Sequence, residues 1–168
     1  MTVTAVRKDP QALTMTIEAE FDASPERVWQ LWADPRQLER WWGPPMYPAT
    51  FTQHALAPGS RMEYHMTGPE GDRHGGYFEV ADVNAPHVLV LRAGFINPEG
   101  SPSADFPVGA IRVRIEAIGQ SRTRMSIENS FPNAAAMEQV LAMGTLEGQT
   151  QAAGQIDAIL AEDSIARY

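Results

Sequence analysis

The fold of this chain is decided by residues 21–43, which read FDASPERVWQLWADPRQLERWWG. Two short helices are predicted here, because Ser24-Pro25 and Asp34-Pro35 each place a capping side chain directly before a proline. Proline at the first helical position loses no hydrogen bond, and the preceding side chain can accept from free amides of the first turn. Gly43-Pro44-Pro45 ends the second helix.

Strands are predicted on both sides of this stretch. Apolar and polar residues alternate from Leu13 to Phe21, and a period of two is typical of a strand with one buried face. Tight turns connect the later segments, which predicts antiparallel pairing. Gly75-Gly76 is predicted to form a bulge or bend, which would exchange the two faces beyond it. The later strand-like segments are residues 50–56, 61–67, 74–83, 87–95, 111–116 and 122–131.

The chain changes to a helical pattern after Pro132. Asn133 is the predicted cap, and the pattern continues to about Asp163, with a break expected near Met143-Gly144. A curved antiparallel sheet with one apolar face needs a cover, and this helix is the only predicted element long enough to supply it. One helix face carries, at spacings of three and four residues, Leu146, Gln149, Ala153, Ile156 and Leu160.

The composition of the chain excludes several classes of function. Asp and Glu outnumber Lys and Arg by 21 to 13, without a basic patch, so nucleic acid and anionic membranes are poor partners. The chain has no cysteine, which excludes disulfides, zinc–thiolate sites and thiol nucleophiles. No stretch approaches the ~18–20 apolar residues of a membrane span, and residues 1–10 have no apolar core of signal-peptide length. We therefore expect a cytoplasmic protein.

The sequence resembles the START-like (SRPBCC) superfamily, and within it the branch named for the activator of the ninety-kilodalton heat-shock-protein ATPase. The resemblance implies an α+β helix-grip fold with two short helices after the first strand. In that fold a curved antiparallel sheet of about six to seven strands wraps around a long C-terminal helix over an apolar cavity. We expect one such domain over residues 11–165 and an N-terminal tail over residues 1–10. Besides residues 21–44, the resemblance rests on Pro58-Gly59, Met66, Gly68-Pro69-Glu70-Gly71, Gly75-Gly76-Tyr77-Phe78-Glu79-Val80, Glu147-Gly148, Ile156 and Leu160.

The chain departs from this family at two positions of the terminal helix. After Glu147-Gly148 the family usually has a Trp and later a Leu, where this chain has Gln149 and Ala153. Either other side chains fill the space, or the cavity is larger and wetter here, because interiors tolerate voids poorly. In the second case Gln149 would offer a hydrogen bond to the polar head of a ligand. The candidates for filling the space are Trp32, Trp41, Trp42, Met143 and a residue of the sheet.

Few residues offer catalytic or metal chemistry. Glu63, Glu79 and Glu147 are weak candidates for acid–base catalysis, because a carboxylate against an apolar wall has a raised pKa. The alternative is that each pairs with an arginine, such as Arg61, or faces water. We expect no metal and no cofactor, since no ligand-spacing motif is present. The histidines considered as ligands are His54, His65, His74 and His87.

The sequence favours a non-enzymatic domain that binds a small, mostly hydrophobic molecule between the sheet and the terminal helix. One alternative is a small cofactor-free enzyme of the polyketide cyclase or hydratase type, which would need an inward Glu79 or Glu147. Another is an interaction module for a chaperone or regulator protein, which would need a large exposed apolar patch. The chain is expected to be a monomer or a homodimer. The predicted ligand contacts are Trp32, Trp41, Phe51, Tyr64, Met66, Phe78, Phe95, Met143, Glu147, Gln149 and Ala153.

Overall fold

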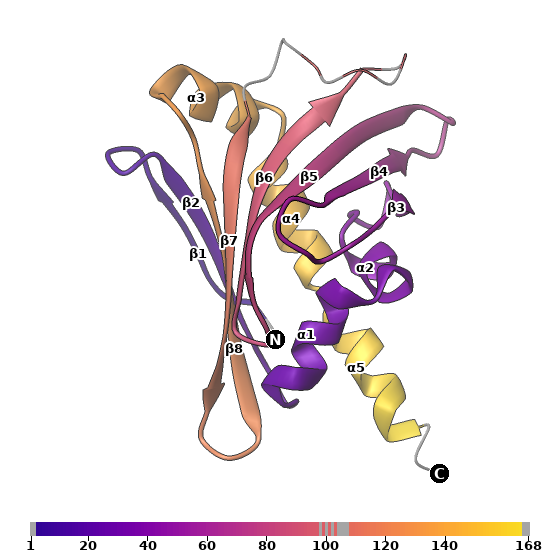
Figure 1. Cartoon of the computed structure of the whole chain (residues 1–168), viewed down its shortest axis with the longest axis vertical. Helices are drawn as coiled ribbons and strands as arrows, with labels where there is room; N and C mark the ends of the chain where they lie inside the picture. The colour runs from indigo at the N-terminus through magenta and orange to yellow at the C-terminus, as the bar shows by residue number, and fades with distance from the viewer. Residues whose placement is uncertain (1–2, 98, 100, 102, 104–107, 166–168) are drawn as a thin grey trace.

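The fold is an antiparallel sheet that curves over a set of helices (Figure 1). The computed structural model describes residues 3–97, 99, 101, 103 and 108–165. Within these residues eight strands pair in the order β1-β2-β8-β7-β6-β5-β4-β3. The strands are β1 (Val3–Asp9), β2 (Thr14–Phe21), β3 (Ala49–Gln53), β4 (Arg61–Thr67), β5 (Arg73–Asn84), β6 (Val88–Ile96), β7 (Gly109–Ile118) and β8 (Arg122–Ser130). The helices are α1 (Pro25–Ala33), α2 (Pro35–Trp41), α3 (Ala134–Ala142), α4 (Thr145–Ala153) and α5 (Ile156–Ile165).

The two short helices begin where the sequence predicts. The Ser24 hydroxyl accepts a hydrogen bond from the Arg27 amide at 3.2 Å, and the Asp34 carboxylate accepts from the Arg36 amide at 3.0 Å. Asn133 caps α3 in the same way.

The curved antiparallel sheet and the C-terminal helices confirm the predicted α+β helix-grip fold, with one strand more than expected.

The additional strand is β1, which lies in the segment that we expected to be an N-terminal tail. It pairs antiparallel with β2 along most of its length. The connecting turn is held by Asp9, whose carboxylate accepts from two amides two and three residues later. Val3 packs against a small buried cluster under β2. Hydrogen bonding and this contact hold the segment in the sheet, although most of its side chains are exposed.

The terminal helix is divided into three segments. The expected break near Met143-Gly144 is confirmed, and Gly144 there has a φ of +80°, which glycine adopts without a steric cost. A second, unexpected break follows at Gly154. As a result α4 packs against β1 and β2, whereas α5 packs against α2 (Figure 1). Among the described residues no helix has the length and apolarity needed to cross a bilayer.

Charged and polar side chains tie α5 to the two short helices. Arg27 Nε lies 2.5 Å from the Asp163 carboxylate, and Arg40 pairs with Glu162. At the junction of α4 and α5, Gln155 Nε2 donates to the Gly43 carbonyl at 2.7 Å. These contacts fix α5 against the end of α2.

The predicted bulge at Gly75-Gly76 is wrong. The ladders from β4 to β5 and from β5 to β6 run in register through both glycines, and the irregularity lies between Val80 and Asp82. Gly76 serves a different purpose, because a Cβ at this position would overlap the ring of Tyr64 on the neighbouring strand. The register therefore keeps Phe78 on the inner face, toward the helices, and Glu79 on the outer face.

The buried apolar side chains form two separate clusters. The larger cluster joins α1, α2 and α5 to the middle of the sheet and contains Trp32, Trp41 and Phe78. The smaller cluster joins α4 to β2 and consists of Met15, Ile17, Leu146 and Ala153. This division means that α4 leans on the β1–β2 edge of the sheet and not on the β4–β6 part.

Candidate functional site

Four apolar side chains on the inner face of β4 and β6 are half-buried. Their neighbours further along the same strands are fully buried. Tyr64 pairs with Gly76, and Gly76 pairs with Phe95, so the three residues form one row across β4, β5 and β6. By contrast, Met62 and Leu91 on the same face are 0% exposed. A water-sized sphere thus reaches one end of this face. We call the half-buried residues Tyr64, Met66, Ala93 and Phe95 the inner patch.

One side of α4 carries small residues and leaves open space next to the helix. A Cβ built on Gly148 would meet no atom within 4 Å. Gly148 and Ala152 are four residues apart and therefore lie on the same side of α4. Leu146 and Ala153, in contrast, pack into the smaller cluster. Unfilled space therefore borders the side of α4 that carries Gly148.

An aromatic cluster lies beneath the inner patch. Trp42 is in edge-to-face contact with Tyr64 and Phe78, with ring centroids 6.2 and 5.2 Å apart, and Phe51 stacks beside Tyr64. Trp32 and Trp41 are fully buried below, and their indole nitrogens donate to the Met125 sulfur and the Leu31 carbonyl. The predicted contacts Trp32, Trp41, Phe51 and Phe78 are therefore core residues that support the patch.

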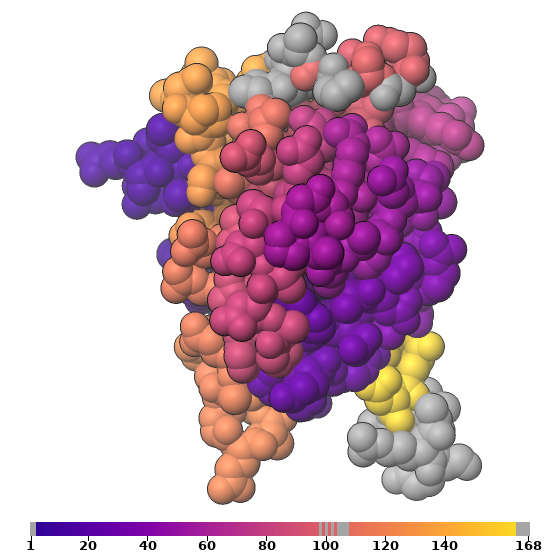
Figure 2. Space-filling model, viewed as in Figure 1, coloured from indigo at the N-terminus to yellow at the C-terminus, as the bar shows by residue number. Residues whose placement is uncertain are grey.

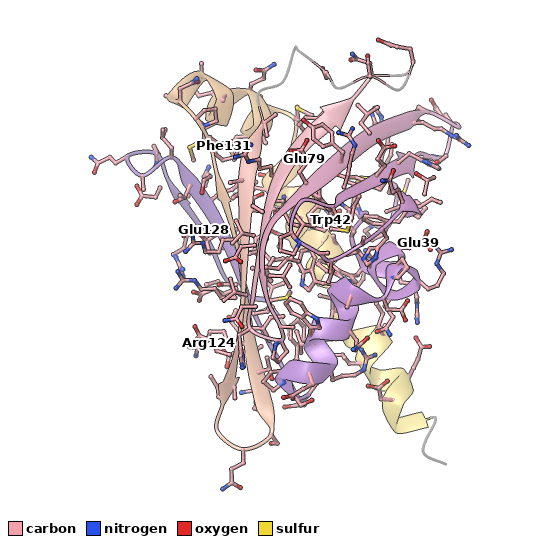
Figure 3. The ribbon with its side chains drawn as sticks, in the orientation of Figure 1. Glu39, Trp42, Glu79, Arg124, Glu128 and Phe131 are labelled. Carbon is pink, nitrogen blue, oxygen red and sulfur yellow. The ribbon has the colours of Figure 1, made fainter. Side chains whose placement is uncertain are left out.

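Trp42 differs from the other two tryptophans of this cluster. Trp42 is the residue directly after α2 (Figure 3). It is 6% exposed. Within the described residues, Trp42 Nε1 is the one buried side-chain nitrogen or oxygen without a hydrogen-bond partner. Burial raises the pKa of the Tyr64 hydroxyl, and a hydrogen-bonding approach of the Trp42 side chain lowers it in part. Our sequence-based list of ligand contacts missed Trp42, because a bonding deficit has no signature in the sequence.

Gln149 faces the sheet, as predicted, but its amide is already used. Gln149 Oε1 accepts from Asn129 Nδ2 at 3.0 Å, and Gln149 Nε2 donates to Asn129 Oδ1 at 3.1 Å. Asn129 on β8 is 6% exposed and Gln149 is partly buried, so the pair is a partly buried polar bridge between α4 and the sheet. Gln149 is therefore paired with a residue of the sheet. Ala153 beside it is fully buried.

Three predicted residues do not face the interior. Glu79 lies on the outer face near Arg61, because the ladder is regular at Gly75-Gly76 (Figure 3). Glu147 is exposed, since it is two residues from Gln149 and so on the opposite side of α4. Met143 is 48% exposed, because the helix breaks directly after it. Glu147 and Met143, predicted as ligand contacts, and Glu79, a weak catalytic candidate, therefore lie away from the inner face.

Three of the remaining polar candidates have protein partners. Glu63 accepts from Arg61 at 2.8 Å. Two histidine rings are hydrogen-bonded to backbone carbonyls, His54 to Trp32 and His87 to Ile115, each at 2.9 Å. In the part of the chain that the structure describes, no three residues of a metal-binding type are grouped closely enough to hold an ion.

Two shallow hollows lie on the outer face, which forms much of the surface in Figure 2. Their volumes are about 260 and 200 Å³, and both are lined by Arg112 and Arg114. Acidic side chains accompany these arginines, with Glu116 in the first hollow and Glu18 and Glu128 in the second. Because the charges compensate one another and apolar surface is scarce in the second hollow, the inner patch is the better candidate for an apolar ligand.

Comparison with known proteins finds a matching family and several similar structures. The model of the family described as "Activator of Hsp90 ATPase homolog 1-like protein" matches residues 22–161. The crystal structure of protein Ms6760 from Mycobacterium smegmatis is 42% identical, with 96% of this chain and 99% of that chain covered and a TM-score of 0.86. A solution structure from Arthrobacter aurescens is 43% identical, with 96% and 93% covered and a TM-score of 0.92.

A more distant structure shares the fold alone. DynU16, from the dynemicin biosynthetic locus, is 19% identical with a TM-score of 0.59. The alignment covers 86% of this chain and 47% of DynU16. Among curated proteins, none matches this chain.

Proposed function

This chain belongs to the family of Activator of Hsp90 ATPase homolog 1-like proteins, and from that premise we propose that it binds a small, mostly hydrophobic molecule between the inner patch and α4. The proposal rests on two observations: the inner patch is half-buried, and a Cβ on Gly148 of α4 would meet open space. Contact between these apolar side chains and water is unfavourable in free energy. A ligand that covers the side chains removes that contact and is bound more tightly for it.

The size of this effect is sufficient for useful affinity. A ligand that removes about 200 Å² of apolar surface from water gains about 5 kcal/mol, at roughly 25 cal/mol per Å². Part of this gain is lost to the restricted motion of the bound ligand. The aromatic cluster below the patch is already packed, so little side-chain ordering has to accompany binding.

Binding is better supported than catalysis. A cyclase or hydratase would need an inward acid, and Glu79 and Glu147 both point away from the inner face. The name of the family refers to an ATPase activator, yet a chaperone-binding role would need one large apolar patch. The exposed large apolar side chains among the described residues come from separate segments of the chain: Val6, Met46, Val108 and Met143.

The test is to fill the space beside α4. We expect Gly148→Leu to place a side chain over the inner patch and to weaken the binding of a neutral fluorescent probe, 6-propionyl-2-(dimethylamino)naphthalene, at least tenfold. Glu147→Leu is the matched control, because it adds the same side chain at the neighbouring exposed position. A probe titration followed by emission wavelength measures both. Equal affinity of the Gly148 variant and the wild type would refute the proposed location.

A further inference from the structure

We propose that the ligand carries a neutral hydrogen-bond acceptor, such as a ketone oxygen, and that Trp42 Nε1 and the Tyr64 hydroxyl both donate to it. This inference rests on the proposed function, because it names the chemistry of the molecule bound at the same site. It goes further in assigning a polar contact to a site whose other walls are apolar.

The first donor is an indole N–H that approaches the Tyr64 hydroxyl but has no partner in hydrogen-bond geometry. Trp42 is 6% exposed and its Nε1 is unpartnered among the described residues. Two other tryptophans of the same cluster each have an acceptor, so unpaired indoles are not a general property of this core. Because a buried donor without an acceptor is costly, a ligand that supplies an acceptor stabilises the complex beyond its apolar contact.

The second donor is placed beside the first by the sheet. The hydroxyl end of Tyr64 lies over Gly76, where any side chain would overlap it. The Tyr64 ring is thereby held flat on the inner face, in edge-to-face contact with Trp42 and in the same row as Phe95. Burial raises the pKa of this hydroxyl, so it keeps its proton at neutral pH and remains able to donate.

The charge of the acceptor follows from the surroundings. No member of the inner patch carries a charge, and neither does Trp42. An anionic oxygen at this place would be desolvated without a cation beside it, which is unfavourable. Two neutral donors instead match the two lone pairs of a carbonyl oxygen.

The experiment compares two rigid ligands of the same shape, 9-fluorenone and fluorene, which differ by a carbonyl in place of a CH₂ group. We expect the wild-type protein to bind fluorenone about tenfold more tightly, since one or two hydrogen bonds are gained. In ¹H–¹⁵N spectra, fluorenone should move the Trp42 indole signal downfield, and fluorene should not. Trp42→Phe and Tyr64→Phe should each reduce the preference, whereas Trp29→Phe on α1 should retain it.

Each outcome bears on one of the two proposals. Equal binding of both ligands by the wild type overturns the acceptor inference and leaves the apolar site supported. A preference that persists in both Trp42→Phe and Tyr64→Phe also overturns it. Binding of neither ligand overturns the proposed function together with the inference. If the variants fail to fold, the wild-type indole signal alone decides, because it reports directly on the Trp42 N–H.

Discussion

The buried pair between Asn129 and Gln149 allows a quantitative test of how α4 is held. Replacing Gln149 with Leu removes hydrogen bonds of 3.0 and 3.1 Å and leaves the Asn129 amide without its partner. Each hydrogen bond contributes about 1 kcal/mol, and an unpaired buried polar group costs about 1–3 kcal/mol. We therefore expect Gln149→Leu to lower the free energy of unfolding by about 2 kcal/mol, after the apolar gain from leucine is allowed for.

The double variant distinguishes pairing from mere packing. Asn129→Leu alone should cost about as much as Gln149→Leu, because it leaves the other amide unpaired. The variant with both substitutions should lie within about 1 kcal/mol of the wild type, since an apolar pair of similar shape replaces a polar one. Urea unfolding followed by circular dichroism gives all four free energies. Gln151→Leu, at an exposed position of α4, controls for leucine itself and should change little.

A purely additive cycle would refute this reasoning. If the costs of the two single variants summed to that of the double variant, the amides would not depend on each other. The bridge would then have no energetic role, in spite of its geometry.

Three further predictions concern the helices. Gly148→Ala should stabilise the protein by about 0.5–1 kcal/mol, because alanine is the better helix former and its Cβ would meet no other atom. Gly43→Ala should destabilise the protein, because a Cβ there would overlap backbone atoms. Urea unfolding measures both changes. Hydrogen bonds from the Gln37 side chain and the Arg36 amide hold the pKa of Asp34 below its ordinary value of 3.8, so the stability that Asp34 adds should be lost as the pH falls below 3.8. Asp34→Asn keeps the cap without the charge, so its urea unfolding midpoint should fall less steeply with decreasing pH than that of the wild type. Asp163→Asn should lower the free energy of unfolding by at most about 1 kcal/mol, because the ion pair of Asp163 with Arg27 is partly exposed. This loss should be smaller in about 1 M salt, which screens the pair. A loss that salt leaves unchanged would argue against a charge effect.

Local signals in the sequence predicted most of the fold. Alternation placed the strands, and the capping residue before each proline placed the first residue of α1 and of α2. Strand β1 escaped prediction because its pattern is weak: most of its side chains are exposed, and pairing with β2 holds it. The break at Gly154 escaped because a glycine in an alanine-rich helix is compatible with a continuous helix.

The candidate site was predicted in part. Alternation placed Tyr64 and Met66 on the inner face of β4, where the structure has them. Glu79 was misplaced because two adjacent glycines in a strand are compatible both with a bulge and with a regular strand that accommodates a neighbouring ring. Here Gly76 accommodates the ring of Tyr64. The roles of Trp42 and Gly148 depend on which atoms of distant segments come close, and no local pattern encodes that.

The two breaks in the terminal helix bear on how proteins of this kind can diversify. Bends at Gly144 and Gly154 join α4 to its neighbours, while α5 is anchored separately to α1 and α2. Substitutions in α4 therefore act first on the smaller cluster, whereas the aromatic core belongs to the larger cluster, which the short helices and α5 complete. The proposed ligand site could thus be altered through α4 with little change to the packing of that core.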